Sequence, residues 1–182
     1  MDAAEQQVRQ KGADGFSYSD LSTAVGLRKA SIHYHFPAKS DLLTAIMARY
    51  GKRVMQELET YGDRFDTAEQ QLEGFVAFYR AALQQGSSLC LCVAYAVNAD
   101  GLSANTRQEI ARFRAEVLTW LQHRFEMMQT RPDLPGGFGN ATDAAAATLA
   151  LVEGAQLSAR IAADPAIYDQ ATRRFREQLR RN

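Results

Sequence analysis

Residues 16–36 read FSYSDLSTAVGLRKASIHYHF, and this stretch decides the fold of the first part of the chain. Its serines can cap a short helix that is interrupted at Gly26, and a second short helix begins at about Arg28. Two short helices joined by a tight turn form a helix-turn-helix, whose second helix enters the major groove of DNA. The stretch therefore predicts a DNA-binding head.

Helical periodicity continues through the rest of the chain, and no stretch shows the sustained alternation of a strand. Beyond a first helix that ends near Gly12 and the two short helices, apolar spacing predicts helices at residues 39–61, 72–86, 89–97, 105–128, 142–163 and 165–181. The predicted fold is all-α, with about nine helices. We expect a three-helix, helix-turn-helix DNA-binding domain in residues 1–50 and a larger helical body in residues 51–182.

The composition restricts where the protein works. The hydrophobic fraction of 46% over 182 residues is ordinary for a globular protein. No apolar run approaches the ~20 residues that a membrane helix needs, and the first residues are too polar for a secretion signal. Two cysteines are too few for a disulfide framework. We therefore expect a cytoplasmic protein with no membrane partner.

The charge is distributed unevenly although its total is zero. Residues 1–53 contain eight lysines and arginines against five aspartates and glutamates, whereas the remainder contains thirteen against sixteen. A basic end on an acidic body suits a protein that presents only that end to phosphates. The charge distribution thus agrees with the predicted head.

Residues 15–46, GFSYSDLSTAVGLRKASIHYHFPAKSDLLTAI, resemble the head of the tetracycline-repressor (TetR) family of bacterial transcription regulators. That family has a glycine-aromatic pair, a short helix, a glycine followed by an apolar residue, a recognition helix ending in Tyr-x-His-Phe, and a lysine before a leucine-rich helix. His33 departs from the pattern, since the family most often has tyrosine there. LVEGAQLSAR, residues 151–160, is similar to the family's penultimate helix. The resemblance implies a homodimeric, ligand-responsive regulator of a palindromic operator on double-stranded DNA, most often a repressor.

The exposed side of the second short helix carries the predicted base contacts. Ile32 and Phe36 lie four residues apart and face the core of the head, so Lys29 and His33 share a different face. An arginine or lysine there can donate to guanine O6 and N7, and a small residue can touch a thymine methyl group. The residues predicted to contact bases are Arg28, Lys29, Ala30, Ser31 and His33, with a phosphate as the alternative for Ser31 and His33. Those predicted to contact phosphates are Ser17, Ser19, Tyr34, His35 and Lys39.

The resemblance also implies that the body encloses a cavity for a small effector, and its aromatic residues indicate a hydrophobic or amphipathic compound. The candidate lining residues are aromatic, polar or thiol side chains: Tyr79, Cys90, Cys92, Tyr95, Asn98, Phe113, Trp120 and Gln156. Asn98 and Gln156 are the most informative, because a buried amide requires a hydrogen-bond partner that a ligand could supply.

Residues 143–163, DAAAATLALVEGAQLSARIAA, contain many small side chains that let another helix approach closely. Together with the last helix they could form a four-helix dimer interface across a two-fold axis, as a palindromic operator requires. The alternative is that the same faces pack within one protomer. The candidate interface residues are Leu149, Val152, Ile167, Ala171, Phe175 and Leu179.

The cysteines and histidines of the chain, and its lack of catalytic motifs, give weaker indications of function. Cys90 and Cys92 either pack in the core or act as thiols that sense an oxidant or electrophile. His33 and His35 are two residues apart on a helix and cannot bind one metal ion together. No catalytic motif or cofactor-binding pattern is present, so an all-helical enzyme is the disfavoured alternative. We predict no metal and no cofactor.

Overall fold

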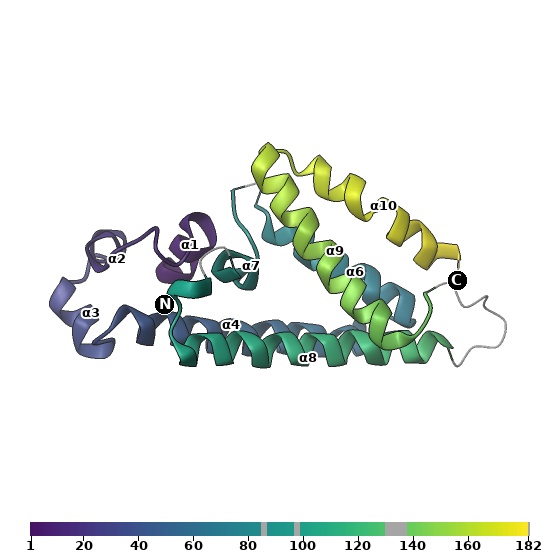
Figure 1. The fold of residues 1–182 in the computed structure, drawn as a ribbon, viewed down its shortest axis with the longest axis horizontal. Helices are drawn as coiled ribbons and strands as arrows, with labels where there is room; N and C mark the ends of the chain where they lie inside the picture. Colours follow the sequence, from purple (N-terminus) through teal and green to yellow (C-terminus); the bar gives the residue numbers. More distant parts are fainter. Residues whose placement is uncertain (85–86, 97–98, 130–137, 182) are drawn as a thin grey trace.

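The computed structural model describes residues 1–84, 87–96, 99–129 and 138–181, which form helices with no strand among them (Figure 1). This confirms the all-α prediction. The helices are α1 (Asp2–Lys11), α2 (Tyr18–Val25), α3 (Lys29–His35), α4 (Lys39–Glu59), α5 (Tyr61–Arg64), α6 (Ala68–Ala82), α7 (Leu91–Ala96), the 3-10 helix η1 (Ala99–Gly101), α8 (Ala104–Gln129), α9 (Ala141–Ala162) and α10 (Ala166–Arg181). The sequence did not predict α5, because four residues are too few to show a helical repeat.

The head contains the two short helices and the turn that the quoted stretch predicts. Ser17 precedes α2, and its hydroxyl accepts a hydrogen bond from the Asp20 backbone N–H, while the Asp20 carboxylate accepts one from the Ser17 N–H. Gly26 ends α2 with a φ of +68°, in the left-handed region that favours glycine. The second helix, α3, begins at Lys29, and Arg28 is its N-cap residue.

Helices α4 and α8 lie side by side along the long axis of the molecule (Figure 1). Two contacts show that these helices run parallel. The hydroxyl oxygens of Thr44 on α4 and Thr106 on α8 are 2.8 Å apart. Further toward the C-terminal end of both helices, the rings of Tyr50 on α4 and Phe113 on α8 are 5.6 Å apart. Gly51 permits this approach, because a Cβ there would lie 3.2 Å from the Phe113 ring.

The body packs α6, α9 and α10 onto this pair, with α9 in contact with both α8 and α10. Its core is aromatic: the Phe75 ring on α6 stacks on the Trp120 ring of α8, with 5.9 Å between ring centres. The buried Tyr168 hydroxyl on α10 donates to the Val76 carbonyl at 2.8 Å. The ring contact joins α6 to α8, and the Tyr168 hydrogen bond joins the last helix to α6.

One continuous helix connects the head to the body. Because α4 extends from Lys39 to Glu59, the boundary expected between residues 50 and 51 falls inside it. None of the described helices has both the length and the apolar composition that a membrane span needs.

Candidate nucleic-acid interface

The outer face of α3 is open to solvent. Ile32 anchors the helix, with 9% of its surface exposed, and Phe36 beside it is half-buried. The other side chains of the helix are exposed, and Tyr34 is 84% exposed. These exposed residues include the following predicted DNA contacts: Lys29, Ala30, Ser31, His33, Tyr34 and His35. A short helix that is anchored on one side can present all of them to a groove.

The orientation of α3 depends on Tyr18 and Ser22, neither of which is among the predicted DNA contacts. The Tyr18 hydroxyl lies 2.8 Å from the Phe36 carbonyl oxygen, and its ring packs edge-on against the His33 ring at 4.5 Å. Burial raises the pKa of this phenol, so it remains a donor. The Ser22 hydroxyl donates to the Leu27 carbonyl in the turn at 2.5 Å. These bonds connect both ends of α3 to α2.

Two of the predicted phosphate contacts also have partners inside the head. The Lys39 ammonium donates to the Phe16 carbonyl at 2.6 Å and lies 4.4 Å from the centre of the Phe16 ring. The Ser17 hydroxyl caps α2. Ser19 and Arg28 are exposed. Lys39 therefore stabilises the start of α4 whether or not it also contacts a phosphate.

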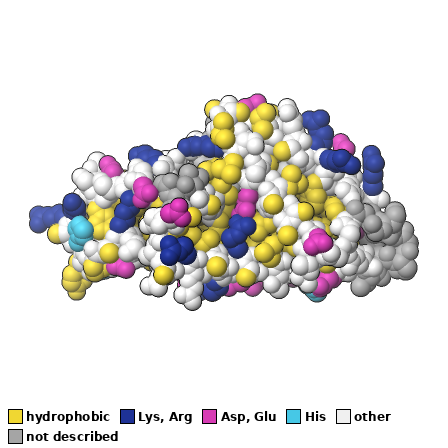
Figure 2. Space-filling model, viewed as in Figure 1, with side chains coloured by type: hydrophobic (Ala, Val, Ile, Leu, Met, Phe, Trp, Pro, Cys, Tyr) yellow, Lys and Arg dark blue, Asp and Glu magenta, His cyan; other side chains and the backbone are white. Residues whose placement is uncertain are grey.

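Positive charge is displayed at the end of the molecule where α2 and α3 lie. Figure 2 shows Lys or Arg side chains and a histidine on the surface at that end. His33 packs on Tyr18 and His35 packs on Tyr34, so the two histidines have different neighbours. Within the described ranges, no three His, Cys, Asp or Glu side chains gather as a metal site would require.

The candidate effector residues in the described part of the body are buried, and several belong to one polar cluster in the core. The cluster joins α7 to its neighbours: the Tyr95 hydroxyl donates to the Leu43 carbonyl at 2.8 Å, and the Tyr50 hydroxyl lies 3.1 Å from the Cys90 sulfur. Phe113 on α8 packs against the Tyr50 ring of this cluster, and Trp120, further along α8, stacks on Phe75. Asn98 lies outside the described residues.

Gln156 already has partners within the chain. Its amide oxygen accepts a hydrogen bond from the Cys90 N–H at 2.9 Å, and its amide nitrogen donates to the Tyr79 carbonyl at 2.6 Å. The side chain is completely buried. The protein itself thus supplies a donor and an acceptor to this amide, and a contact of Gln156 with an effector stays a prediction. The Trp120 indole N–H, in contrast, is buried with no hydrogen-bond partner among the described residues.

The two cysteine thiols differ in acidity. The hydrogen bonds of the Cys92 thiol and the Tyr50 hydroxyl lower the pKa of the Cys90 thiol to about 7, although burial opposes the shift. The same contact with Cys90, together with burial, raises the pKa of Cys92 well above its usual value. Both thiols are buried and neither is in a disulfide.

Half of the candidate interface residues face inward. Leu149, Val152 and Leu179 are buried in the core of the protomer, at 2% exposure or less. Ile167 and Phe175 are half-buried, and Ala171 is exposed. The exposed side of α9 carries a different row of small and apolar residues, which we call the α9 stripe: Ala147, Ala150, Gly154, Leu157 and Ile161. Figure 2 shows hydrophobic side chains exposed on this side of the body.

Comparison with known proteins agrees with this geometry. Residues 1–46 match the sequence model of the family described as "Bacterial regulatory proteins, tetR family". A TetR-family transcriptional regulator from Agrobacterium tumefaciens is 28% identical, over 97% of this chain and 93% of that chain, with a TM-score of 0.88. A TetR transcriptional regulator from Legionella pneumophila is 25% identical, over 97% and 92%, with a TM-score of 0.84. The reduced form of E. coli NemR shares the fold at 23% identity, over 93% and 89%, with a TM-score of 0.78. No curated protein sequence matches the chain.

Proposed function

We propose that this chain, which belongs to the TetR family of bacterial regulatory proteins, is a cytoplasmic, homodimeric repressor that binds a palindromic operator and leaves it when a small effector binds its body. The observation that carries the proposal is the exposed face of α3, which is anchored by Ile32 and fixed to α2 through Tyr18. A helix presented in this way can read base edges in the major groove.

Helix α4 is the route by which the body can act on the head. It begins beside the head at Lys39, and its body half packs against α8 through Gly51 and Tyr50. An effector that binds one arrangement of the body more tightly than another shifts the population toward that arrangement. If α4 moves with the body, the two α3 helices of a dimer no longer match half-sites about one helical turn apart. Operator affinity then falls.

The aromatic core supports a hydrophobic or amphipathic effector. Tyr61, Phe75 and Arg124 surround the Trp120 ring, with the Arg124 guanidinium 4.2 Å from its centre. A compound with a flat apolar part and a hydrogen-bond acceptor could pack in this region and accept from the Trp120 N–H, which has no partner among the described residues.

The proposal predicts that replacing Lys29 weakens binding to the operator more than binding to unrelated DNA. In Lys29→Ala, binding to an operator selected from a random duplex library should weaken by about 1–3 kcal/mol, because a donor to a base edge is lost. Binding to a scrambled duplex of the same length should change less. Fluorescence anisotropy with both duplexes, at one salt concentration, measures the two losses.

Two other lysines provide the comparison. Lys52 is exposed on the body half of α4, so Lys52→Ala should leave both affinities close to wild type. Lys39→Ala should weaken binding to both duplexes by a similar factor, because the Lys39 ammonium donates a hydrogen bond to the Phe16 carbonyl and so stabilises the head rather than reading a base. Equal losses on both duplexes for Lys29→Ala would show that α3 does not read bases through this side chain.

A second function is supported by the Tyr50–Cys90 contact. Because the contacts with Cys92 and Tyr50 lower the pKa of the Cys90 thiol, this residue forms a thiolate more readily than an ordinary cysteine does, and a thiolate adds to electrophiles. With an α,β-unsaturated carbonyl compound, a carbon–sulfur bond forms at the β-carbon and the α-carbon takes up a proton. The adduct would break the 3.1 Å contact to Tyr50 on α4 and enlarge a side chain that is 1% exposed.

This second function predicts that N-ethylmaleimide releases the wild-type protein from its operator. Cys90→Ser should bind the operator and remain bound after treatment. Cys92→Ser should respond as the wild type does, because the pKa of Cys92 is raised and its thiol is largely neutral. Mass spectrometry of the modified residue, together with a gel-shift assay, measures the response. Release of Cys90→Ser by the reagent would rule out Cys90 as the trigger.

A further inference from the structure

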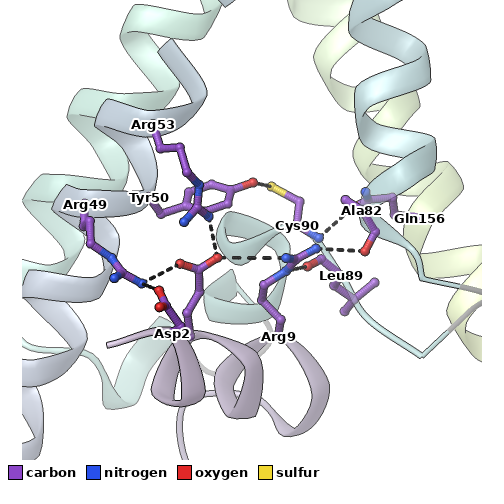
Figure 3. A network of polar contacts seen from close by, with 10 residues as sticks. Asp2, Arg9, Arg49, Tyr50, Arg53, Ala82, Leu89, Cys90 and Gln156 are labelled. Carbon is purple, nitrogen blue, oxygen red and sulfur yellow. Dashed lines mark hydrogen bonds and ion pairs between the residues drawn. The ribbon is translucent and has the colours of Figure 1, made fainter. Parts of the chain in front are cut away.

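The end of α1, in the head, is hydrogen-bonded to the segment that precedes α7 in the body. Residues 88–90 are named the junction segment. The Arg9 side chain donates through Nε to the Leu89 carbonyl at 2.7 Å, and the Leu89 N–H donates back to the Arg9 carbonyl at 3.2 Å. The Arg9 Nη2 donates to the Ala82 carbonyl at the end of α6, at 2.8 Å (Figure 3). One arginine therefore joins α1 to α6 and to the junction segment.

The other side of the junction segment is bonded to the core of the body. Cys90 follows Leu89, and its N–H donates to the Gln156 amide on α9 while its sulfur contacts the Tyr50 hydroxyl on α4 (Figure 3). The segment thus lies between α1 of the head and the helices α4 and α9, and it leads directly into α7. A displacement of the body core at Cys90 reaches Leu89 through one peptide unit.

Neighbouring charged side chains fix the orientation of the Arg9 guanidinium. The Glu5 carboxylate is 5% exposed, lies 3.9 Å from the Arg9 Nη1, and accepts from Arg53 on α4 at 2.6 Å. A planar guanidinium can meet the two carbonyls and this carboxylate at once, which the single ammonium of a lysine cannot do in the same geometry. The last turn of α1 has another body contact, because Arg160 on α9 donates to the Gln10 carbonyl at 2.6 Å.

We propose that Arg9 is a positioning residue for operator release: it makes α1 follow the junction segment, so that the head responds to the body through α1 as well as through α4. This inference rests on the proposed function. Hydrogen bonds of 2.7–2.8 Å weaken steeply when stretched, so a shift of the segment by about 1 Å must either move α1 or break them. Helix α1 packs against α2 and therefore moves with the helix that supports α3.

The test uses DNA as the probe, because coupling between two sites is reciprocal. If the body acts on the head through Arg9, operator binding at the head must act on the junction segment. In the wild type, a saturating duplex selected from a random library should slow amide hydrogen exchange at residues 88–91 by about fivefold or more. In Arg9→Met the duplex should still bind, but this slowing should be lost. Hydrogen-exchange mass spectrometry of free and bound protein gives both values.

The control is Arg80→Met, which removes an arginine of α6 that pairs with Asp169 on α10, within the body. It should keep the wild-type response. Arg9→Lys retains the charge near Glu5 and should lose the response, so it replaces Arg9→Met if that variant does not fold. The proposal is overturned if a folded Arg9 variant shows the same slowing of amide exchange as the wild type. It is also overturned if the wild type binds DNA without any change in amide exchange at residues 88–91. Failure of the wild type to bind any selected duplex would instead remove the proposed function itself.

Discussion

A protein carrying Ala150→Arg together with Leu157→Arg should be monomeric and should bind its operator at least about 100-fold more weakly than the wild type. Both residues belong to the α9 stripe, which is exposed in the protomer. A continuous row of exposed apolar and small side chains usually marks a surface that another chain covers. Two arginines there would have to be desolvated without partners in a dimer, so the dimer should not form.

The glycine of the stripe is not required by the protomer's own packing. A Cβ at Gly154 would meet no atom within 4 Å, so nothing in the protomer itself demands a glycine there. A groove of about 460 Å³ lies next to the stripe, between α9 and α10, lined in part by Ala147, Leu151 and Phe175. A partner helix can pack closely against this surface, as in a four-helix interface.

The loss of DNA affinity follows from symmetry. A dimer places two α3 helices on two half-sites, whereas a monomer has the contacts of one. Light scattering after size exclusion measures the mass, and anisotropy at fixed salt measures affinity for the selected duplex. Ala111→Arg, on an exposed position of α8, is the control and should remain dimeric. A dimeric double variant would show that the α9 stripe is not the interface. A monomer with wild-type affinity would show that operator binding does not require the dimer.

The head could be predicted from sequence because its determinants are local. Ser17 and Asp20 cap α2 from three residues apart, and Gly26 makes the turn through its own φ. Each of these features is visible within one turn of helix. The contact of Lys39 with Phe16 spans 23 residues, and no local pattern shows it.

The polar contacts of the core could not be predicted, since the partners are distant in the chain. Gln156 bonds to Cys90 and Tyr79, which are 66 and 77 residues away, and Arg9 bonds to Leu89, 80 residues away. A sequence shows that a polar residue lies among apolar neighbours. Whether the protein or a ligand satisfies its hydrogen bonds is decided only by the fold.

Helix α9 shows where periodicity fails to identify a face. Small and apolar residues occur on all its sides, so the pattern cannot tell which side meets the protomer's core. Leu149 and Val152 turn inward, whereas Ala150, Gly154 and Leu157 turn outward. A helix that is apolar all round is one that other helices cover, which supports a partner for the outward side.

Gln156→Met should lower the free energy of unfolding by about 2–5 kcal/mol, a large part of the stability of a domain of this size. Methionine has nearly the shape of glutamine, so the core remains filled. The Cys90 N–H and the Tyr79 carbonyl, however, lose their partners at a position with no access to water. Each unsatisfied buried group costs about 1–3 kcal/mol. Urea unfolding, with midpoint and slope compared to wild type, measures the loss.

Gln156→Glu separates the two hydrogen bonds. The carboxyl oxygen still accepts from the Cys90 N–H, but only the protonated acid can donate to the Tyr79 carbonyl. Burial raises the pKa of the introduced carboxyl in the folded state above its unfolded value. The variant should therefore be closest to wild type in acid and should lose stability as the pH rises through the raised folded-state pKa.

The control for Gln156→Met is Gln122→Met, at a half-buried glutamine on α8 that bonds to Glu126. It should change the free energy of unfolding by less than about 0.5 kcal/mol. If Gln156→Met unfolded at the wild-type urea concentration, the amide would not stabilise the core, and a role in contacting the effector would be the better explanation for a glutamine there.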